Sequence, residues 1–539
     1  MPPKSLTSRE PNLMVHGAQE RRKMPVVDFQ FCLHVEMQMK FLLRCIVASV
    51  QLVVFVAADL REDLSQTGVT AYFPGDSEFA GASRAYNTRF TFTPAAIAYP
   101  ETVQDVSNVV KVAVANGISV SARSGGHSYV ANGLGGESGS LVVDMSNMKA
   151  INIDQNTKVA TIETGNRLGN VAKALNAGGR ALPHGTCPYV GIGGHSAYGG
   201  FGYTSRLWGL TLDTVQAVNA VLANGTIVRA TAASQSDIFW AFRGAGPSFG
   251  IVTSIETTTF ALPTSSLIFS YQWNTLDPQQ ASAALQVFQS YPQQNSLPGE
   301  LGLEIVLGQG WTDGTLSFTV QGGYYGSDGR SGIQRLMTPF ISAMNLPSTS
   351  LKVQGDGTYI DTVRILAEED GGLDMNGQDV TDTFYARSII VPENEVLSKE
   401  ASDSFMNYLA NQGSNVPNLD YWFIEIELFG GQNSKINSVS ADSTSFARRD
   451  GLLTMQIYAS SGDRTPFPDN GFTFIDGVMN AMTSTMPSSW NYGAYMNYIE
   501  DRLTNWQQRY FGSHYERLVS IKRQVDPGNV FNFPFGVEV

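Results

Sequence analysis

Two nucleophilic side chains stand in glycine-rich stretches of this sequence. Cys187 lies in HGTCP (184–188), just before GIGGH (191–195), and His127 lies in RSGGHSY (123–129). Glycine loops expose backbone N–H groups and let a diphosphate approach closely. A thiol and an imidazole held in two such loops predict two covalent attachment points for one cofactor. Taken singly, each has a plainer interpretation, since a buried thiol is usually inert and a histidine often serves only as a hydrogen-bonding group.

The N-terminal region has the pattern of a secretory signal peptide that starts at Met39. Basic residues precede an apolar run over 45–56, and small residues follow it up to Ala58. The run is shorter than the about 20 residues that span a bilayer, and a buried core helix is the alternative interpretation. Residues 1–38 then form an upstream extension. We therefore expect a secreted, extracellular protein that begins near residue 59.

Cleavage at that point leaves an acidic protein with one cysteine. The full chain of 539 residues has a formal net charge of −13. Residues 1–58 hold seven basic and four acidic side chains together with Cys32 and Cys45, so the remainder carries −16 and keeps only Cys187. A lone thiol in an oxidising compartment needs an explanation. The negative charge makes nucleic acid and anionic membranes unsuitable partners. A hydrophobic content of 42% fits a large globular core.

Helices and strands alternate in the first part of the expected mature chain. Amphipathic spacing predicts helices at 100–117, 168–177 and 237–244, and short apolar runs predict strands at 118–122, 140–144, 159–163, 215–222, 226–230 and 251–255. Asn224-Gly225-Thr226 is both an N-glycosylation sequon and a tight turn between two of these strands. The pattern indicates an α+β domain.

The pattern changes near Pro263, after which period-two alternation prevails. Strands are expected at 269–273, 316–324 and 421–428, with helices at 279–290, 394–412 and 506–525. Such alternation is typical of an antiparallel sheet with one covered face. We therefore divide the chain at 1–58, 59–265, 266–494 and 495–539, the last segment returning to the first domain.

Two common site types are not expected. No G-x-G-x-x-G motif opens a helix after an early strand, so the Rossmann fingerprint is missing. No C-x-x-C or H-x-x-x-H spacing joins Cys187 with His127, His184 or His195, so we expect no metal site.

The same stretches, read with their context, resemble one flavoprotein superfamily. RSGGHSY (123–129), HGTCPYVGIGGHSAYGGFG (184–202), GLTLD (209–213), DIFWAFRGAG (237–246) and FGIVT (249–253) resemble the FAD-binding fold of the vanillyl-alcohol oxidase and p-cresol methylhydroxylase superfamily. YFGSHYERLVSIKRQVDPGNVFNF (510–533) resembles the C-terminal segment of the berberine-bridge-enzyme group. Within that group, 184–195 is most similar to fungal glucooligosaccharide oxidase and its relatives.

This resemblance implies a two-part FAD-binding domain at 59–265, an antiparallel-sheet substrate domain at 266–494 with helices on one face, and bicovalent FAD. His127 would attach to the flavin 8α-methyl group and Cys187 to C6. Val190, three residues after the cysteine, would leave room for oxygen at the flavin. The other implied FAD contacts are Arg123, Ser124, Gly125, Gly126, Ser128, Gly191, Gly193, Gly194, His195, Ile251, Val252 and Asn529.

The proposed catalytic base lies in the motif Tyr495-Met496-Asn497-Tyr498. Two tyrosines at this spacing are usually core or edge residues, but the family pattern Y-x-N-Y implies that Tyr498 takes the proton from the substrate hydroxyl. An unperturbed tyrosine, with a pKa of about 10, needs help to do so near neutrality. In the expected strand 421–428, Glu425 and Glu427 share one face. Glu427 stands where the family has an aspartate, although a solvated strand face is the alternative. Implied substrate contacts are Tyr129, Glu425, Gln456 and Tyr495.

The expected function is therefore oxidation of the anomeric C1 hydroxyl of an oligosaccharide to a lactone, with dioxygen reduced to hydrogen peroxide, by a monomeric enzyme. An oxidase of a secondary-metabolite alcohol, amine or phenolic is the alternative. A non-catalytic carbohydrate- or flavin-binding protein is a third interpretation. A polar groove with aromatic side chains would favour a sugar, whereas a closed apolar pocket would favour a metabolite.

Overall fold

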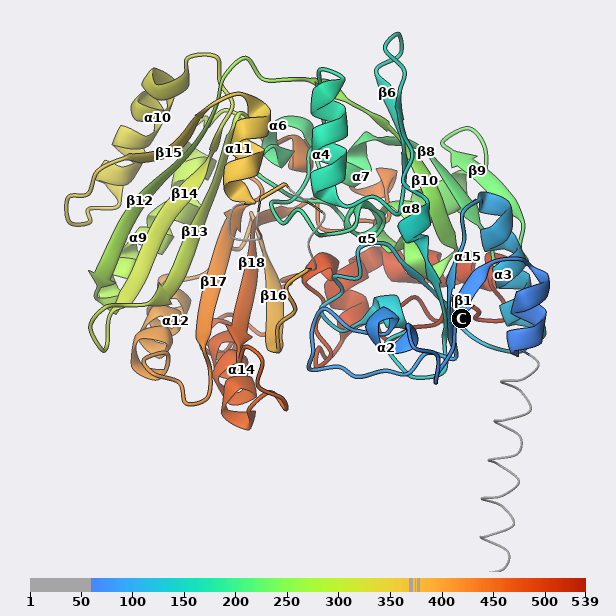
Figure 1. Ribbon diagram of the computed structural model, residues 1–539. Coiled ribbons are helices and arrows are strands. Elements are labelled where there is room, and N and C mark those ends of the chain that lie inside the picture. The colour runs from blue at the N-terminus through green and yellow to red at the C-terminus, as the bar shows by residue number, and fades with distance from the viewer. Residues whose placement is uncertain (1–59, 368–371, 374, 376–378) are drawn as a thin grey trace, which may run out of the picture. The chain divides into compact units, whose positions relative to one another are not determined.

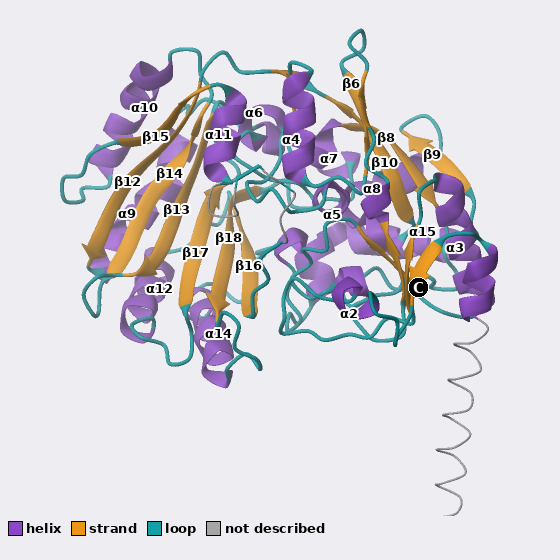
Figure 2. Cartoon of the chain, in the orientation of Figure 1, coloured by secondary structure: helices purple, strands orange, loops and turns teal. Residues whose placement is uncertain are grey.

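The computed structural model describes residues 60–367, 372, 373, 375 and 379–539. The expected signal peptide, Cys32 and Cys45 lie outside these residues. Asp59–Val539 form one unit by their internal contacts. The architecture is mixed α+β, as the sequence predicted, with a four-stranded and a five-stranded sheet formed early in the chain and a larger antiparallel sheet formed later (Figures 1 and 2).

The first sheet places the first glycine loop. It has the order β1-β2-β4-β3, and its strands are β1 (Thr70–Tyr72), β2 (Ala96–Tyr99), β3 (Val120–Arg123) and β4 (Leu141–Asp144). Strands β2, β4 and β3 run parallel, and α3 (Val103–Ala115) connects β2 to β3. Parallel neighbours need such a crossover. The apolar face of α3 packs on this sheet in one hydrophobic cluster. This packing fixes the end of β3, and the loop RSGGHSY (123–129) begins there.

The second sheet is antiparallel and five-stranded. Its order is β5-β6-β10-β8-β9, with β5 (Ile151–Ile153), β6 (Val159–Glu163), β8 (Val215–Val221), β9 (Ile227–Thr231) and β10 (Ile251–Thr258). The helices α4 (Leu168–Ala177) and α8 (Ser236–Ala245) pack in its hydrophobic cluster. Asn224 is exposed in the turn between β8 and β9, where its side chain accepts a hydrogen bond from Thr226 N–H at 2.9 Å.

The third sheet has seven antiparallel strands in the order β15-β12-β14-β13-β17-β18-β16. They are β12 (Ser266–Leu276), β13 (Leu301–Gln309), β14 (Leu316–Tyr324), β15 (Lys352–Gly357), β16 (Phe384–Pro392), β17 (Tyr421–Leu428) and β18 (Gly451–Ser460). One face is covered by the helices α9 (Pro278–Gln294), α10 (Gly329–Ala343), α12 (Lys399–Gln412) and α14 (Asp469–Thr483).

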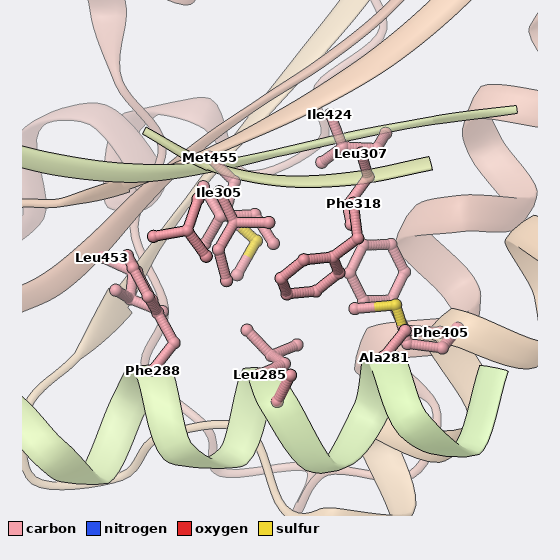
Figure 3. Packing of buried hydrophobic residues seen from close by; sticks show 14 of the residues in the cluster. Ala281, Leu285, Phe288, Ile305, Leu307, Phe318, Phe405, Ile424, Leu453 and Met455 are labelled. Carbon is pink, nitrogen blue, oxygen red and sulfur yellow. The ribbon is translucent and has the colours of Figure 1, made fainter. Parts of the chain in front are cut away.

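Alternation along these strands separates the two faces of the sheet. Ile424 of β17 points into the core with Ala281, Leu285 and Phe288 of α9 (Figure 3). Ile426 belongs to the same buried cluster. The intervening residues, including Glu425 and Glu427, lie on the other face and line a cavity. Successive side chains of a strand point to opposite faces, so the apolar pattern that builds the core also fixes which polar residues reach the cavity.

The C-terminal segment departs from the expected single helix over 506–525. The regular helix α15 spans only Tyr515–Val525, after a π-helical turn at Gln507–Phe511 and a 3₁₀ turn at Gly512–His514. Gly512 has φ +52°, a left-handed conformation that interrupts a continuous α-helix. The apolar face of α15 joins the cluster of α8 and the second sheet. The C-terminal segment thus packs back on the N-terminal part of the fold.

Candidate active site

A cavity of about 1000 Å³ lies between the glycine loops and the polar face of the seven-stranded sheet. This volume is at the upper end of the roughly 300–1,000 Å³ found for ligand pockets. The cavity brings together most of the residues singled out from the sequence. These are Arg123, Ser124, Gly125, Gly126, His127, Ser128, Tyr129, Cys187, Val190, Gly191, Gly193, Gly194, His195, Val252, Glu425, Glu427, Gln456, Tyr495 and Tyr498.

The two glycine loops touch each other back to back. A Cβ atom on Gly125 would lie 2.3 Å from the backbone nitrogen of Gly191, and one on Gly191 would lie 2.0 Å from that of Gly125. A side chain at either position would push the loops apart. The Ser124 hydroxyl accepts a hydrogen bond from Gly193 N–H at 3.2 Å and donates one to the carbonyl of Thr164. The loops therefore form one backbone-rich wall of the cavity, which suits a diphosphate.

His127 and Cys187 line the same cavity, one from each loop. The His127 ring stacks on Tyr86 with centroids 4.0 Å apart, and its Nε2 lies 2.5 Å from Oδ2 of Asp379. Cys187 is solvent-exposed at the start of a turn in which Val190 N–H donates to the Cys187 carbonyl at 3.4 Å. An exposed thiol and a hydrogen-bonded imidazole facing one cavity fit the two attachment points expected from the sequence.

Tyr498 and Glu427 form a hydrogen-bonded pair in this cavity. The Tyr498 hydroxyl donates to Oε1 of Glu427 at 3.0 Å. Glu427 is only 6% exposed, and its Oε2 has no hydrogen-bond partner among the described residues. The expectation that a carboxylate pairs with Tyr498 agrees with this geometry, whereas a solvated strand face does not.

Burial is the main cause of the shifted pKa values of Glu427 and Tyr498. It raises the pKa of Glu427 well above its ordinary value, and the neighbouring carboxyls of Glu425 and Glu304 raise it further. Burial also raises the pKa of Tyr498, and the charge of Glu427 adds to that effect. The carboxylate therefore does not make Tyr498 easier to ionise. It is instead a strong proton acceptor at the far end of a Tyr498–Glu427 chain.

Glu304 is a cavity residue that the sequence analysis missed. It lies opposite Glu427 in the pairing of β13 with β17. Its Oε1 accepts hydrogen bonds from the Tyr203 hydroxyl at 2.6 Å and the Gln321 amide at 2.7 Å. The sequence feature that could have revealed it is a single acidic residue within the apolar run LGLEIVLGQ (301–309). Asp379 and Tyr86 were missed as well, because neither is near His127 in sequence.

Tyr129 and Gln456 meet across the cavity. The Gln456 amide donates to the Tyr129 hydroxyl at 2.5 Å, and the Tyr129 ring stacks near that of Tyr498 with centroids 6.1 Å apart. Gln456 also pairs in register with Glu425 on β17. Tyrosines, amides and carboxyls thus line the side of the cavity that faces the sheet.

Three predicted contacts are placed differently from the rest. The Tyr495 ring borders the cavity, but its hydroxyl accepts hydrogen bonds from the backbone N–H groups of Gly200 and Phe201, at 3.0 and 3.1 Å. Ile251 is fully buried in the core of the first sheet and lies outside the cavity lining. Asn529 is also outside that lining, in a turn where its N–H donates to the Asp526 carbonyl at 3.0 Å.

Comparison with known families accounts for the glycine loops and the C-terminal segment. A family model described as an FAD-binding domain matches residues 94–231, and a model described as berberine and berberine-like matches residues 494–538. The first region contains both loops, and the second contains Tyr495 and Tyr498. Fold and site together define an FAD-dependent oxidoreductase that acts on CH–OH donors.

Comparison with whole proteins narrows this class. Xylooligosaccharide oxidase of Thermothelomyces thermophilus is 33% identical over 489 residues, covering 89% of this chain and 94% of that protein. Glucooligosaccharide oxidase of Sarocladium strictum is 35% identical over 462 residues, covering 84% and 89%. The solved structure of the Acremonium strictum glucooligosaccharide oxidase, with 6-S-cysteinyl, 8α-N1-histidyl FAD, matches with a TM-score of 0.82 at 31% identity over 89% of this chain and 99% of that one. The chain belongs to the berberine-bridge-enzyme-like FAD oxidases, among the oligosaccharide oxidases.

Within the part of the chain that the structure describes, no helix has both the length and the apolar character needed to cross a membrane.

Proposed function

We propose that this enzyme oxidises the anomeric C1 hydroxyl of an oligosaccharide to a lactone and reduces dioxygen to hydrogen peroxide. The observation that carries the proposal is the hydrogen bond of 3.0 Å from Tyr498 to Glu427, inside the cavity that His127 and Cys187 line. It puts a proton acceptor in the same space as the two expected flavin attachment points. The relatives reported above, which are oligosaccharide oxidases, support the choice of substrate.

FAD would be held by both loops and attached through His127 and Cys187, in the way that a cysteine and a histidine hold the 6-S-cysteinyl, 8α-N1-histidyl FAD of the Acremonium strictum glucooligosaccharide oxidase. When bound, FAD supplies the acceptor for the C1 hydride and passes the electrons to dioxygen. The backbone of 123–128 and 191–194 would surround its diphosphate and ring. Val190 borders the cavity three residues after Cys187, where a small side chain leaves space for oxygen.

Tyr498 and Glu427 would act together as the base. Because burial, and then the charge of Glu427, raise the pKa of Tyr498, a free phenolate is not the acceptor. Instead, the Tyr498 oxygen takes the proton of the C1 hydroxyl while its own proton moves to Glu427, whose raised pKa favours this uptake. General-base catalysis of this kind contributes about 10²- to 10⁴-fold to rate. Both groups touch the reacting protons and are the proposed catalytic residues.

The sheet face would orient the sugar. Tyr129, Gln456 and Glu425 present a hydroxyl, an amide and a carboxyl to the cavity, and Tyr495 borders it. Positioning the C1–H bond over the ring is the largest expected contribution to rate. This polar and aromatic lining suits a sugar better than an apolar metabolite.

We further propose that the enzyme is secreted as a monomer. The signal-peptide pattern over 39–58 supports export, and its net charge of −16 after cleavage keeps it from nucleic acid and anionic surfaces. The exposed Asn224 would then be available for glycosylation.

A peroxide-coupled screen tests the proposal directly. The purified protein is assayed with gluco-, xylo- and chitooligosaccharides and with small alcohols and phenolics. Peroxide formed with a reducing oligosaccharide, accompanied by the corresponding lactone or aldonic acid, is the expected result. Turnover only of a phenolic or an amine would replace the sugar with a metabolite. If no compound in the panel reduces the flavin, the result favours a non-catalytic binding protein over an oxidase.

The covalent attachment has its own test. After denaturation in acid, flavin should stay with the protein in the wild type and in Cys187→Ala, which keeps the link through His127. Release of all flavin from the wild type would refute both links.

A further inference from the structure

The His127 side chain is held by two groups that no part of the cofactor supplies. Nε2 lies 2.5 Å from Oδ2 of Asp379, and the imidazole ring stacks on Tyr86 with an interplanar angle of 22°. The side chains of His127 and Asp379 are 12% and 21% exposed, so water screens the contact only in part. Neither Asp379 nor Tyr86 belongs to the hydrogen-bonded pair of Tyr498 and Glu427.

The Asp379 contact determines which ring nitrogen is free to react. An ionised carboxylate only accepts hydrogen bonds, so Nε2 must carry the hydrogen. In a neutral imidazole the other nitrogen, Nδ1, then keeps its lone pair. Among the described residues, no hydrogen bond occupies Nδ1. A carboxylate on one ring nitrogen also fixes the orientation of the ring, as it does for metal-binding histidines.

The chain holds Asp379 and Tyr86 in place through one short backbone pairing. Asp382 N–H donates to the Tyr86 carbonyl at 3.1 Å, and Thr88 N–H donates to the Asp382 carbonyl at 2.8 Å. Asn87, fully buried between them, accepts from Phe384 N–H at 3.2 Å and donates to the Tyr129 carbonyl at 2.7 Å. Asp379 therefore approaches His127 from a segment that is tied to the stacking residue.

From these contacts we propose that Asp379 is a positioning residue for covalent flavin attachment. It holds His127 as the Nε2–H tautomer, turns the Nδ1 lone pair toward the cavity and takes up the positive charge that the ring gains on bonding. This inference rests on the proposed attachment through His127 and extends it to the group that makes the histidine reactive.

The attachment balances with dioxygen as the oxidant. One C–H bond of the flavin 8α-methyl group breaks and the Nδ1–C bond forms. The proton of that C–H bond goes to solvent, and the proton on Nε2 passes to Asp379 and from there to solvent, so two protons are released in all. The two electrons released reach dioxygen, which also takes up two protons and leaves as hydrogen peroxide. No reagent beyond those of the proposed activity is needed.

A Cys187→Ala background isolates this link, because flavin that survives denaturation is then held by His127 alone. Full-length protein carrying Cys187→Ala, with and without Asp379→Leu, is purified at a fixed expression time. Total FAD is measured per chain, and the covalent fraction is measured by in-gel flavin fluorescence and intact mass. Asp442→Leu is the matched control, since this carboxylate also faces a histidine, with Oδ1 3.3 Å from Nε2 of His514, but lies outside the cavity lining.

The expected result is a covalent fraction about tenfold lower with Asp379→Leu, at unchanged total FAD, and no change with Asp442→Leu. An unchanged covalent fraction with Asp379→Leu overturns the role of Asp379 while leaving the attachment itself intact. Complete loss of covalently bound flavin in Cys187→Ala alone contradicts the link through His127 and, with it, the role of Asp379. If the leucine variant does not fold, Asp379→Asn decides, because it keeps the shape but not the charge and should also lower the fraction.

Discussion

Glu304 and Glu427 lie directly opposite each other on neighbouring strands, β13 and β17, with both side chains in the cavity. Like charges at directly opposite positions destabilise a sheet. Burial raises the pKa of both carboxyls, and Glu304 adds to the rise at Glu427. Hydrogen bonds from Tyr203, Gln321 and Tyr498 offset part of the cost. The pKa values of both carboxyls therefore lie above that of an ordinary glutamate.

This pair predicts a shift in the pH dependence of catalysis. Glu427 must be ionised to take up the proton, so the rate of flavin reduction by saturating sugar should rise with pH as Glu427 loses its proton. Glu304→Gln removes one cause of the raised pKa. The rising limb should then move to lower pH, measured by stopped-flow reduction across a pH series.

Exposed Glu516 provides the control for this shift. Glu516→Gln should leave the limb where it is. A limb that moves to higher pH in Glu304→Gln, or that does not move, would mean that the ionisation of Glu427 does not control the rate.

The Tyr498 hydroxyl predicts a large and specific loss of rate. Tyr498→Phe removes the atom that receives the substrate proton, so flavin reduction should slow by about 10²- to 10⁴-fold. Tyr515→Phe is a matched control, because the Tyr515 hydroxyl also donates to a glutamate, Glu538 at 3.0 Å, but outside the cavity lining. It should keep the wild-type rate. Equal rates in wild type and Tyr498→Phe would show that another group is the base.

Helices and strands were predictable from the sequence wherever the apolar residues followed a single helical or strand period. The strand 159–163, the helix 168–177 and the strands 316–324 and 421–428 have the bounds expected from the sequence. Alternation in the last of these also placed Glu425 and Glu427 on one face. The prediction of a single helix over 506–525 was wrong. The helical spacing of apolar residues continues through Gly512, but the positive φ of this residue interrupts the α-helix.

The site was predictable only where motifs carry it. His127, Cys187 and Tyr498 stand in recognisable stretches, and the structure brings them to one cavity. Glu304 and Asp379 reach the site through strand pairing and a loop more than a hundred residues away in sequence. Such contacts depend on tertiary packing, which local periodicity does not encode.

His195 predicts a loss of stability in acid. Burial, and then the neighbouring His184, lower the pKa of His195 to about 3. The unfolded chain binds a proton here near pH 6.5, and the folded chain does so only near pH 3. The contribution of His195 to the free energy of unfolding is therefore fully present above pH 6.5. It declines as pH falls, by up to about 1.4 kcal/mol per pH unit. His195→Gln should lose less unfolding free energy between pH 7 and pH 5. Equal losses in chemical denaturation would contradict this assignment.

Lys522 predicts how firmly the C-terminal segment is held. Its ammonium group is 2.7 Å from Oδ2 of Asp526, both side chains are fully buried, and it also donates to the carbonyls of Ser248 and Phe531. Lys522→Met would leave Asp526 charged and unpaired in the interior, at a cost of about 3–5 kcal/mol in unfolding free energy. Lys399 and Asp403 form a pair at the same spacing on the solvent-facing side of α12, 2.5 Å apart. Lys399→Met should cost less than about 0.5 kcal/mol. Denaturant titration of both variants measures the difference, and similar losses at the two sites would show that the buried pair does not anchor the segment.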